Sequence, residues 1–419
     1  MIKRTINLSI ILVVLWCISL NLAWAKIFID INSPFFEKIP IAVEQPKLTS
    51  SDGRQAANTL VDTLSNDLIY QGFFSVFKSM AEVQDGKVDY KVTSEFSKQG
   101  DTVTVVLKLY DLSTGSMIVG RRYIGSSSDM RKMAHRFANE IVLAITGRPG
   151  LTLSRIVFVS EKNGRREIYS ADFDGSGIKQ ETNLHTIVMS PRYSPDARFI
   201  AFTSFKTGRP CLYLKDMASK NIKKMACFQG VNMSPAWHPS SKRLAVTLSK
   251  SGSPDIYLVD INGHIIKRLT RGPGINVSPS FSPDGGKIVF VSDRAGGPQL
   301  YILDIATGKI SRLTYSGSYN TDPQWSPAGD RIVYVSRVAG RFQIFTISPS
   351  GGEPVQLTFE GNNENPSWSP DGRQILFCSN RNGGNKHLFV MQSNGQQQRL
   401  LVHYGRRDYF PFWGPNTFK

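Results

Sequence analysis

The sequence predicts a six-bladed β-propeller that follows a small α+β domain. Two observations predict the propeller: a Pro-x-aromatic-x-Pro motif occurs six times, and successive motifs lie 43 to 45 residues apart. A third is that each interval contains the same order of strand-like segments and turns. Four-stranded units at this period are typical of propeller blades. We therefore expect a leader at 1–25, an α+β domain without repeats at 26–150 and the propeller at 151–419.

The leader has the three parts of a secretory signal peptide. Lys3 and Arg4 precede an apolar run at 10–18, and a small-x-small cleavage site ends at Ala25. The run is shorter than the roughly 20 apolar residues that span a membrane, and no later segment is long and apolar enough. We expect an exported protein that is cleaved after Ala25 and has no transmembrane segment in its mature form.

The segment from 26 to 150 combines short strands with two helices. Five apolar runs predict strands at 26–31, 39–44, 88–93, 103–110 and 117–123. The last three are expected to form an antiparallel meander. The first helix is expected at 53–70 with Ser50 or Ser51 as its cap. The second begins near Ser128 and buries a stripe of apolar residues at helical spacing, namely Met130, Met133, Phe137, Ile141 and Ile145. Gly-Arg-Pro-Gly at 147–150 ends this helix and forms the linker.

The six aromatic motifs mark the innermost strands of the predicted blades. They lie at 191–195, 235–239, 279–283, 323–327, 366–370 and 411–415. After each of the first five come a turn such as Ser-Pro-Asp-Gly, a continuous apolar strand, a second strand and a short third strand. Proline lacks the N–H that an inner neighbour would need, so the motif suits a strand with one edge on the channel. A two-sheet sandwich is the alternative, but the constant spacing favours a propeller.

The two ends of the propeller are predicted to meet in one blade. The apolar strand at 156–159 opens the repeats without an aromatic strand before it, and the chain ends four residues after the last motif. We expect 410–413 to complete the blade that begins at Ile156, because a shared blade closes a ring that would otherwise expose strand edges.

Charge and cysteine content narrow the partners and the redox state. The net charge of +17, or 17 − 2 = +15 after loss of Lys3 and Arg4, either favours anionic partners or serves solubility. Export argues against nucleic acid and leaves anionic glycan, lipid or acidic envelope proteins. Cys211 and Cys227 flank a predicted hairpin turn near 218–220, so they form either a disulfide or two thiols. Cys378 is expected to be a buried thiol.

The sequence lacks the motifs of common enzymes. It contains no Gly-x-Ser-x-Gly, no phosphate-binding loop and no His or Cys spacing typical of metal sites. The segment 172–177 is either a hairpin turn or the start of a calcium loop that lacks its closing glutamate. We predict no catalytic residue, no metal and no cofactor.

Polar residues recur just before the aromatic motifs. Three residues before the first proline stand Asn232, Asn276, Asn320 and Asn363, and one residue before it stand Ser190, Ser234, Ser278, Asp322 and Asn365. These positions lie on the loops that enter the innermost strands, hence around one mouth of the channel. Either they form turns, or their amides and hydroxyls form a collar that binds an inserted loop or peptide.

The whole sequence resembles the TolB family of the Tol–Pal envelope system of Gram-negative bacteria. The resemblance depends on the signal peptide, the α+β domain, the Gly-Arg-Pro-Gly linker and the six repeats. It implies a non-enzymatic periplasmic adaptor that supports outer-membrane integrity and constriction at cell division. This chain departs from the family at 238–241, which lacks Ser-Pro-Asp-Gly, so the turn expected there is in doubt.

The resemblance also implies two protein partners. The propeller mouth would bind the peptidoglycan-associated lipoprotein Pal, at Val231, Asn232, Ser234, Asn276, Val277 and Ser278, with Asn320, Asp322, Asn363 and Asn365 completing the mouth. The N-terminal segment would bind the inner-membrane protein TolA, at Lys26, Ile27, Phe28, Ile29, Asp30 and Ile31. This segment is either a two-state switch that couples the two partners or a permanently docked first strand. The alternative function is a secreted propeller hydrolase or lyase that acts on envelope glycan.

Overall fold

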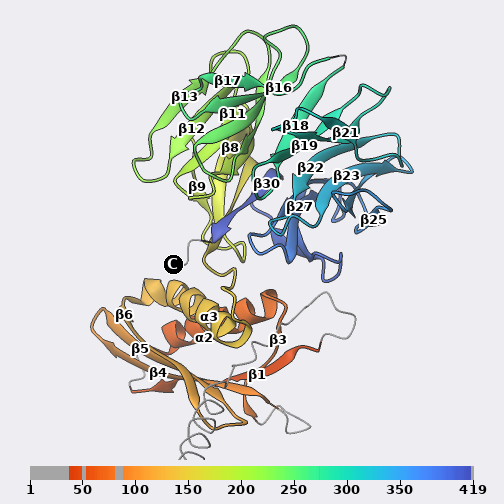
Figure 1. The fold of residues 1–419 in the computed structure, drawn as a ribbon. Helices are drawn as coiled ribbons and strands as arrows, with labels where there is room; N and C mark the ends of the chain where they lie inside the picture. The colour runs from red at the N-terminus through yellow and green to blue at the C-terminus, as the bar shows by residue number, and fades with distance from the viewer. Residues whose placement is uncertain (1–36, 50–52, 81–87, 273, 417–419) are drawn as a thin grey trace, which may run out of the picture.

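The computed structural model describes residues 37–49, 53–80, 88–272 and 274–416. An N-terminal α+β part is followed by a β-propeller of six four-stranded sheets (Figure 1). The predicted fold class is therefore confirmed. The signal peptide and the strand expected at 26–31 lie outside the described residues. Across the described ranges, no helix has both the length and the apolar character needed to cross a membrane.

The α+β part is a sheet with two helices on one face. The sheet has the order β3-β1-β4-β5-β6, with β2 beside β4, and the helices lie on its propeller-facing side (Figure 1). The strands are β1 (Ile39–Val43), β2 (Lys47–Leu48), β3 (Phe74–Phe77), β4 (Tyr90–Gln99), β5 (Thr102–Asp111) and β6 (Met117–Gly125). The meander β4-β5-β6 is confirmed, whereas β2 and β3, which pair parallel with β4 and β1, were not predicted.

The two helices are α2 (Arg54–Tyr70) and α3 (Met130–Thr146), the latter preceded by the short 3-10 helix η3 (Ser127–Asp129). The predicted stripe of α3 is buried from Met130 to Ile141 and half-buried at Ile145. The expected serine cap of α2 is wrong, because Gly53 is its N-cap. A Cβ atom at Gly53 would lie 2.0 Å from Cε1 of Phe96, so the close contact with the sheet requires glycine there.

Each blade is an antiparallel sheet that runs from the channel outward. Blade 1 contains β30 (Arg407–Asn416), β7 (Ser154–Lys162), β8 (Arg165–Asp172) and β9 (Lys179–Gln180); blade 2 contains β10 (Val188–Tyr193), β11 (Phe199–Ser204), β12 (Cys211–Asp216) and β13 (Ile222–Ala226); blade 3 contains β14 (Asn232–Trp237), β15 (Arg243–Leu248), β16 (Asp255–Asp260) and β17 (Ile265–Arg268). Blade 4 contains β18 (Asn276–Phe281), β19 (Lys287–Ser292), β20 (Gln299–Asp304) and β21 (Ile310–Arg312); blade 5 contains β22 (Asn320–Trp325), β23 (Ile332–Val338), β24 (Arg341–Ile347) and β25 (Val355–Gln356); blade 6 contains β26 (Asn363–Trp368), β27 (Gln374–Ser379), β28 (His387–Gln392) and β29 (Arg399–Val402).

The ends of the propeller meet in blade 1, as predicted. β30 pairs antiparallel with β7, and Trp413 stands opposite Ile156. The indole Nε1 of Trp413 donates a hydrogen bond to Oγ of Ser154 at 2.8 Å. The last described strand is therefore the innermost strand of the first blade, and it fastens the ring.

The turn at 238–241 forms without the Ser-Pro-Asp-Gly sequence. The N–H of Ser241 donates to the carbonyl of His238 at 3.0 Å, as the N–H of Gly285 does to Ser282 in the next blade. Ser241 adopts a φ of 59°. In the turn of the next blade the equivalent residue is Gly285, which also has a positive φ. The repeat thus tolerates a non-glycine residue at this position.

Candidate functional site

One residue from each innermost strand lines the propeller channel at the same place in the repeat, and these six are called the waist residues here. In every innermost strand the pairing register shifts just before the first motif proline, as between Met233 and Ala236. The residue at the bulge has a φ of 48° to 52°, and the six residues are Ser190, Ser234, Ser278, Asp322, Asn365 and Phe410. Aspartate and asparagine tolerate this left-handed conformation better than other non-glycine residues do. The conformation therefore explains Asp322 and Asn365, but it does not explain the three serines or Phe410.

The waist separates two hollows. The motif-side hollow, of about 430 Å³, is lined by the prolines and aromatics of the motifs and by all six waist residues. The loop-side hollow, of about 470 Å³, lies where the loops enter the innermost strands of blades 1, 2, 5 and 6. Asp322, Asn365 and Phe410 border both hollows, so they form the constriction between them.

Opposite charges lie at the waist and at the loop-side mouth. The side chain of Asn365 donates to Oδ2 of Asp322 at 2.9 Å, and burial raises the pKa of Asp322. Burial lowers the pKa of Arg192 to about 10, so its guanidinium, which lies over the ring of Phe412, stays charged at neutral pH. At the mouth, Nζ of Lys386 lies 2.6 Å from a carboxylate oxygen of Glu364. The channel wall therefore carries groups of both charge signs.

The four asparagines expected in a collar are instead buried ties between neighbouring segments. Asn232, Asn276, Asn320 and Asn363 are each 0 % exposed. The amide of Asn276 donates to Asp255 of the preceding blade at 2.9 Å, and that of Asn320 donates to Gln299 at 2.8 Å. Asn363 bonds Gln343 in the same way. The collar is therefore wrong for these four amides, whose role is to position the loops at the mouth.

Half-buried neighbours of these asparagines remain available to a ligand. Val231 precedes β14, and Ser234 and Ser278 lie at the waist beside Asp322 and Asn365, all of them partly exposed. Val277 is also half-buried but packs against the core between blades 4 and 5. The sequence located these positions, but the bulge that places them on the channel could be found only from the strand register.

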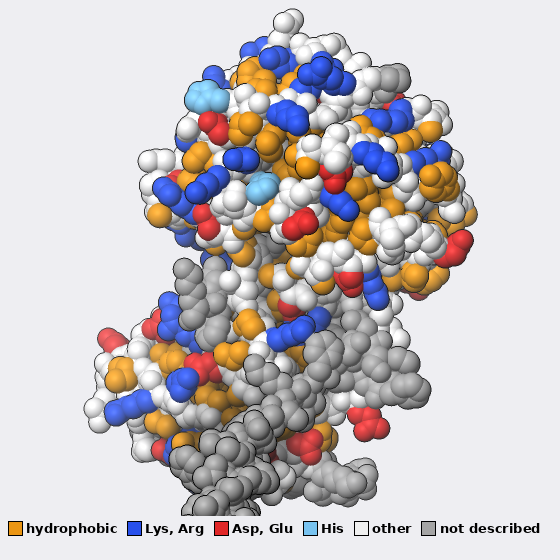
Figure 2. Space-filling view, in the orientation of Figure 1, with side chains coloured by type: hydrophobic (Ala, Val, Ile, Leu, Met, Phe, Trp, Pro, Cys, Tyr) orange, Lys and Arg blue, Asp and Glu red, His pale blue; other side chains and the backbone are white. Residues whose placement is uncertain are grey.

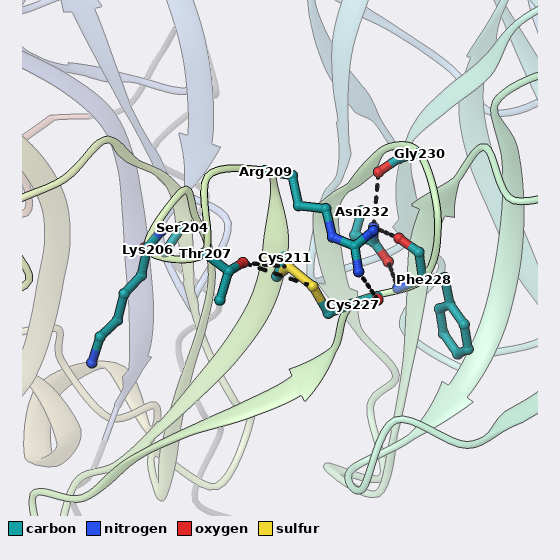
Figure 3. Close-up of a disulfide and its surroundings, with 9 residues drawn as sticks. All are labelled: Ser204, Lys206, Thr207, Arg209, Cys211, Cys227, Phe228, Gly230 and Asn232. Carbon is teal, nitrogen blue, oxygen red and sulfur yellow. Dashed lines mark hydrogen bonds between the residues drawn. A yellow bond between two sulfur atoms is a disulfide. The ribbon is translucent and has the colours of Figure 1, made fainter.

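A disulfide holds the loop that leads to Asn232 (Figure 3). Cys211 begins β12 and Cys227 follows β13, with their Cα atoms 4.6 Å apart. Lys215 faces Ile222 near the turn, and a bulge then shifts the register so that Leu212 faces Ala226, next to the two cysteines. Closing a loop of this length contributes about 3 kcal/mol in the chain-entropy model.

The segment after this disulfide is fixed by the amide of Asn232. Its Oδ1 accepts from the N–H of Phe228, and its Nδ2 donates to the carbonyls of Phe228 and Gly230 (Figure 3). The disulfide and the buried amide thus hold both ends of the loop 228–231. Cys378, the other described cysteine, is a buried free thiol.

A second cluster of titratable groups lies where the helices meet the propeller. Nδ1 of His135 on α3 lies 2.7 Å from Oδ2 of Asp67 on α2, and both side chains are buried. Arg131 forms an ion pair with Asp174 of the β8–β9 turn and a hydrogen bond with Ser176. Ligand atoms of Asp67, His135 and Asp174 lie within 4.8 Å of one another, but both carboxylates already have basic partners. The cluster is therefore best described as an ion-pair network between the two parts.

The turn at 172–177 belongs to this network. The N–H of Gly175 donates to the carbonyl of Asp172 at 2.9 Å, which makes the segment a hairpin turn. Oδ1 of Asp174 accepts from the backbone and the hydroxyl of Ser176. Asp174, whose carboxylate a calcium loop would need as a ligand, is thus used inside the turn and by Arg131.

We expect the His135–Asp67 pair to stabilise the fold more at acidic than at alkaline pH. Burial raises the pKa of Asp67 from 3.8 to about 6, so its contribution is lost as the pH rises through that interval. Burial lowers the pKa of His135, but the hydrogen bond and charge of Asp67 outweigh it and raise the pKa overall. Its contribution is present below 6.5 and is lost as the pH rises through the folded value. Arg131, Asp174 and Asp172 also face the pair.

The measurement is the free energy of unfolding of the wild type and of an Asp67→Asn/His135→Gln variant between pH 5 and 8. The difference in free energy of unfolding between the wild type and the double variant should be larger at pH 5 than at pH 8 by at least about 1 kcal/mol. This is less than the free energy that corresponds to a shift of one pKa unit. Phe359→Ala, a substitution of a non-titratable residue at a 70 % exposed position, is the control and should leave the pH dependence unchanged. A constant difference between wild type and double variant would contradict the prediction.

Comparisons with known proteins place this geometry among TolB proteins. The TolB beta propeller domain family matches residues 142–417. The Tol-Pal system protein TolB of Desulfosudis oleivorans is 36 % identical over 221 residues, which cover 48 % of this chain and 50 % of that protein. The TolB of Geobacter sulfurreducens is 35 % identical over 188 residues, or 41 % and 44 % of the two chains. The matched segment thus spans about half the length of these curated relatives.

A solved structure is similar over more of the chain. The crystal structure of TolB from Acinetobacter baumannii aligns with a TM-score of 0.78 and 28 % sequence identity. The alignment covers 90 % of this chain and 97 % of that one. The similarity therefore includes the α+β part as well as the propeller.

Proposed function

Since the chain belongs to the TolB β-propeller family, we propose that it is a non-enzymatic periplasmic adaptor of a Tol–Pal system. In this proposal the propeller mouth binds a Pal-like peptidoglycan-associated lipoprotein and the N-terminal segment binds a TolA-like inner-membrane protein. The adaptor would connect the two membranes, support outer-membrane integrity and act in constriction at cell division. The mature protein would associate with the envelope only through these partners.

The observation that carries the proposal is the rigid, polar mouth of the channel. Its loops are held by the buried amides of Asn232, Asn276, Asn320 and Asn363, and one of them is also held by the disulfide. Little conformational entropy is lost when a partner binds loops that are already fixed. A preformed mouth with hydroxyl, amide and charged groups suits the capture of a protein loop.

The glycan hydrolase or lyase has less support. That function needs carboxylates that converge on a substrate. The two acidic residues of the loop-side hollow are Asp322, which is bonded to Asn365, and Glu364, which is paired with Lys386. Each is engaged by a neighbour, which favours the adaptor.

We expect Val231→Lys to weaken binding of the Pal-like lipoprotein at least tenfold. Val231 is half-buried beside the mouth, and a lysine there would place an unpaired charge in the contact, which corresponds to a loss of about 1.4 kcal/mol or more. Isothermal titration calorimetry with the soluble domain of the lipoprotein measures the affinity. Val355→Lys, at a 58 % exposed position on the outer strand β25, is the matched control. Unchanged affinity of Val231→Lys would contradict the proposed mouth.

Deletion of 26–37 from the mature chain is expected to abolish binding of the TolA-like protein. The segment Lys26, Ile27, Phe28, Ile29, Asp30 and Ile31 has the composition of a strand that can pair with a partner's sheet edge. Far-ultraviolet circular dichroism should show an intact fold, since both cores lie in later residues. Retained binding of the TolA-like protein would contradict the role of this segment. A change in its binding when the Pal-like lipoprotein is added would support the switch over the docked strand.

A further inference from the structure

The strand β6 leaves one edge of the N-terminal sheet open. It pairs with β5 on one side, and within the described ranges no strand pairs with its other side. In Figure 1 it forms the outer margin of the α+β part, away from β1 and β3. An unpaired edge of nine residues presents a row of backbone N–H and C=O groups to which another strand can add.

The side chains of β6 protect this edge only at its centre. Natural proteins often place charged side chains on an exposed edge, and here Arg121 and Arg122 stand at the centre while large apolar residues are exposed at both ends. Met117 is 54 %, Ile118 40 % and Ile124 65 % exposed. Space-filling Figure 2 shows hydrophobic and basic side chains next to one another on this part of the molecule, with some acidic side chains among them.

The centre of β6 is basic. Arg121 lies on the helix-covered face, where its Nε is 2.6 Å from a carboxylate oxygen of Glu140 on α3. Arg122 is exposed, stands opposite Val106 of β5 on the other face, and has no acidic partner among the described residues. The pattern along the edge is therefore apolar, basic, apolar.

This pattern argues against a second copy of the chain as the occupant. Antiparallel pairing of two β6 strands about their centre would place Arg121 opposite Arg121 and bring both Arg122 side chains close. Like charges that face each other across two strands are destabilising. An acidic strand centre would instead complement Arg122 and would gain from the apolar residues on either side.

We propose that β6 is a docking edge for an extended segment of another protein, with acidic residues at its centre and apolar residues on both sides. The segment adds as a further strand beyond β6. Main-chain hydrogen bonds supply affinity, while Arg122 and the pair Ile118 and Ile124 select the sequence. This surface is separate from the propeller mouth and from the N-terminal segment, so it does not depend on the proposed function.

The probe is a fluorescein-labelled peptide Thr-Val-Ile-Glu-Glu-Ile-Val-Thr, blocked at both ends, measured by fluorescence anisotropy with the full mature chain. A peptide with both glutamates replaced by lysine should bind at least tenfold more weakly. Arg122→Glu and Ile124→Lys should each reduce affinity for the acidic peptide at least tenfold. Arg341→Glu, an exposed charge reversal in blade 5, is the matched control and should change nothing. N-methylation of every second peptide residue removes the main-chain N–H donors along one edge of the peptide. It should abolish binding when the methylated edge is the one that faces β6, which tests strand addition without altering the protein.

Four results would overturn the proposal. Equal binding of the acidic and lysine peptides would show that the central acidic residues do not determine recognition. Unchanged affinity of Arg122→Glu and Ile124→Lys would show that the peptide binds at another site. Binding that appears only after deletion of 26–37 would show that the chain's own N-terminal segment occupies the edge. A dimer seen by sedimentation equilibrium and lost in Ile124→Lys would identify a second copy as the occupant.

Discussion

Deletion of residues 407–419 is expected to leave the propeller unfolded at 25 °C. The deletion removes β30 and with it the innermost strand of blade 1. Trp413 is 4 % exposed and packs with Ile156 and Phe158 of blade 1 and Leu376 of blade 6. Asp408 is fully buried and accepts hydrogen bonds from Ser160 and, at 3.0 Å, from His387 of blade 6. A strand that joins the first and last blades in this way contributes to both cores.

The expected magnitude follows from the size of the side chains lost. Truncating one buried aromatic residue costs about 3–5 kcal/mol, and a domain has only about 5–15 kcal/mol of stability. Losing Trp413, the half-buried Phe412 and the network of Asp408 together is therefore comparable with the whole stability. The exposed edge of β7 would add a site for aggregation.

Urea unfolding followed by tryptophan fluorescence and circular dichroism measures this effect. The single variant Trp413→Ala should lose about 3–5 kcal/mol and still fold, which gives a graded version of the deletion. Phe359→Ala, at a 70 % exposed position, should stay within about 0.5 kcal/mol of the wild type. A deletion variant with wild-type stability would show that the ring does not need its closing strand.

The fold could be predicted because a propeller repeats a local pattern. The motif spacing set the number of blades, and the absence of an aromatic strand before Ile156 located the closure. β3 could not be predicted in the same way, since Phe74–Phe77 is short and pairs with β1 across an intervening helix. The Gly53 cap depends on Phe96, more than 40 residues away. Contacts between distant segments leave no periodic signal in the sequence.

The candidate site was predicted by position but not by role. Asn232, Asn276, Asn320 and Asn363 recur before the motifs, and recurrence alone cannot distinguish a ligand-binding amide from a structural one. The partners of Asn276, Asn320 and Asn363 belong to other strands, such as Asp255 for Asn276 and Gln299 for Asn320, whereas Asn232 bonds Phe228 and Gly230 of its own loop. The His135–Asp67 pair was missed for the same reason, because α2 and α3 bring together residues 68 positions apart.

The structural role of these amides predicts that Asn276→Asp destabilises the propeller by about 3 kcal/mol or more. Asn276 is 0 % exposed and donates from Nδ2 to Oδ1 of Asp255, which is 1 % exposed. The substitution replaces the donor with a second carboxylate oxygen at this contact. An uncompensated charge in a buried site costs about 3–5 kcal/mol, and Arg294, which donates to Oδ1 of Asn276, offsets part of it.

Two controls and a pH series separate this cause from a loss of partner binding. Asn262→Asp, in an exposed turn, should be neutral, and Asn320→Asp should cost less, because the partner Gln299 can rotate its amide to donate. Two carboxylates at one site raise the pKa of one of them, so the protonated variant is stabilised at acidic pH and this stability is lost as the pH rises. The deficit of Asn276→Asp should therefore shrink between pH 7 and pH 4. A variant that unfolds like the wild type at pH 7, yet no longer binds the Pal-like lipoprotein, would return Asn276 to the binding surface and contradict its role as a tie between blades.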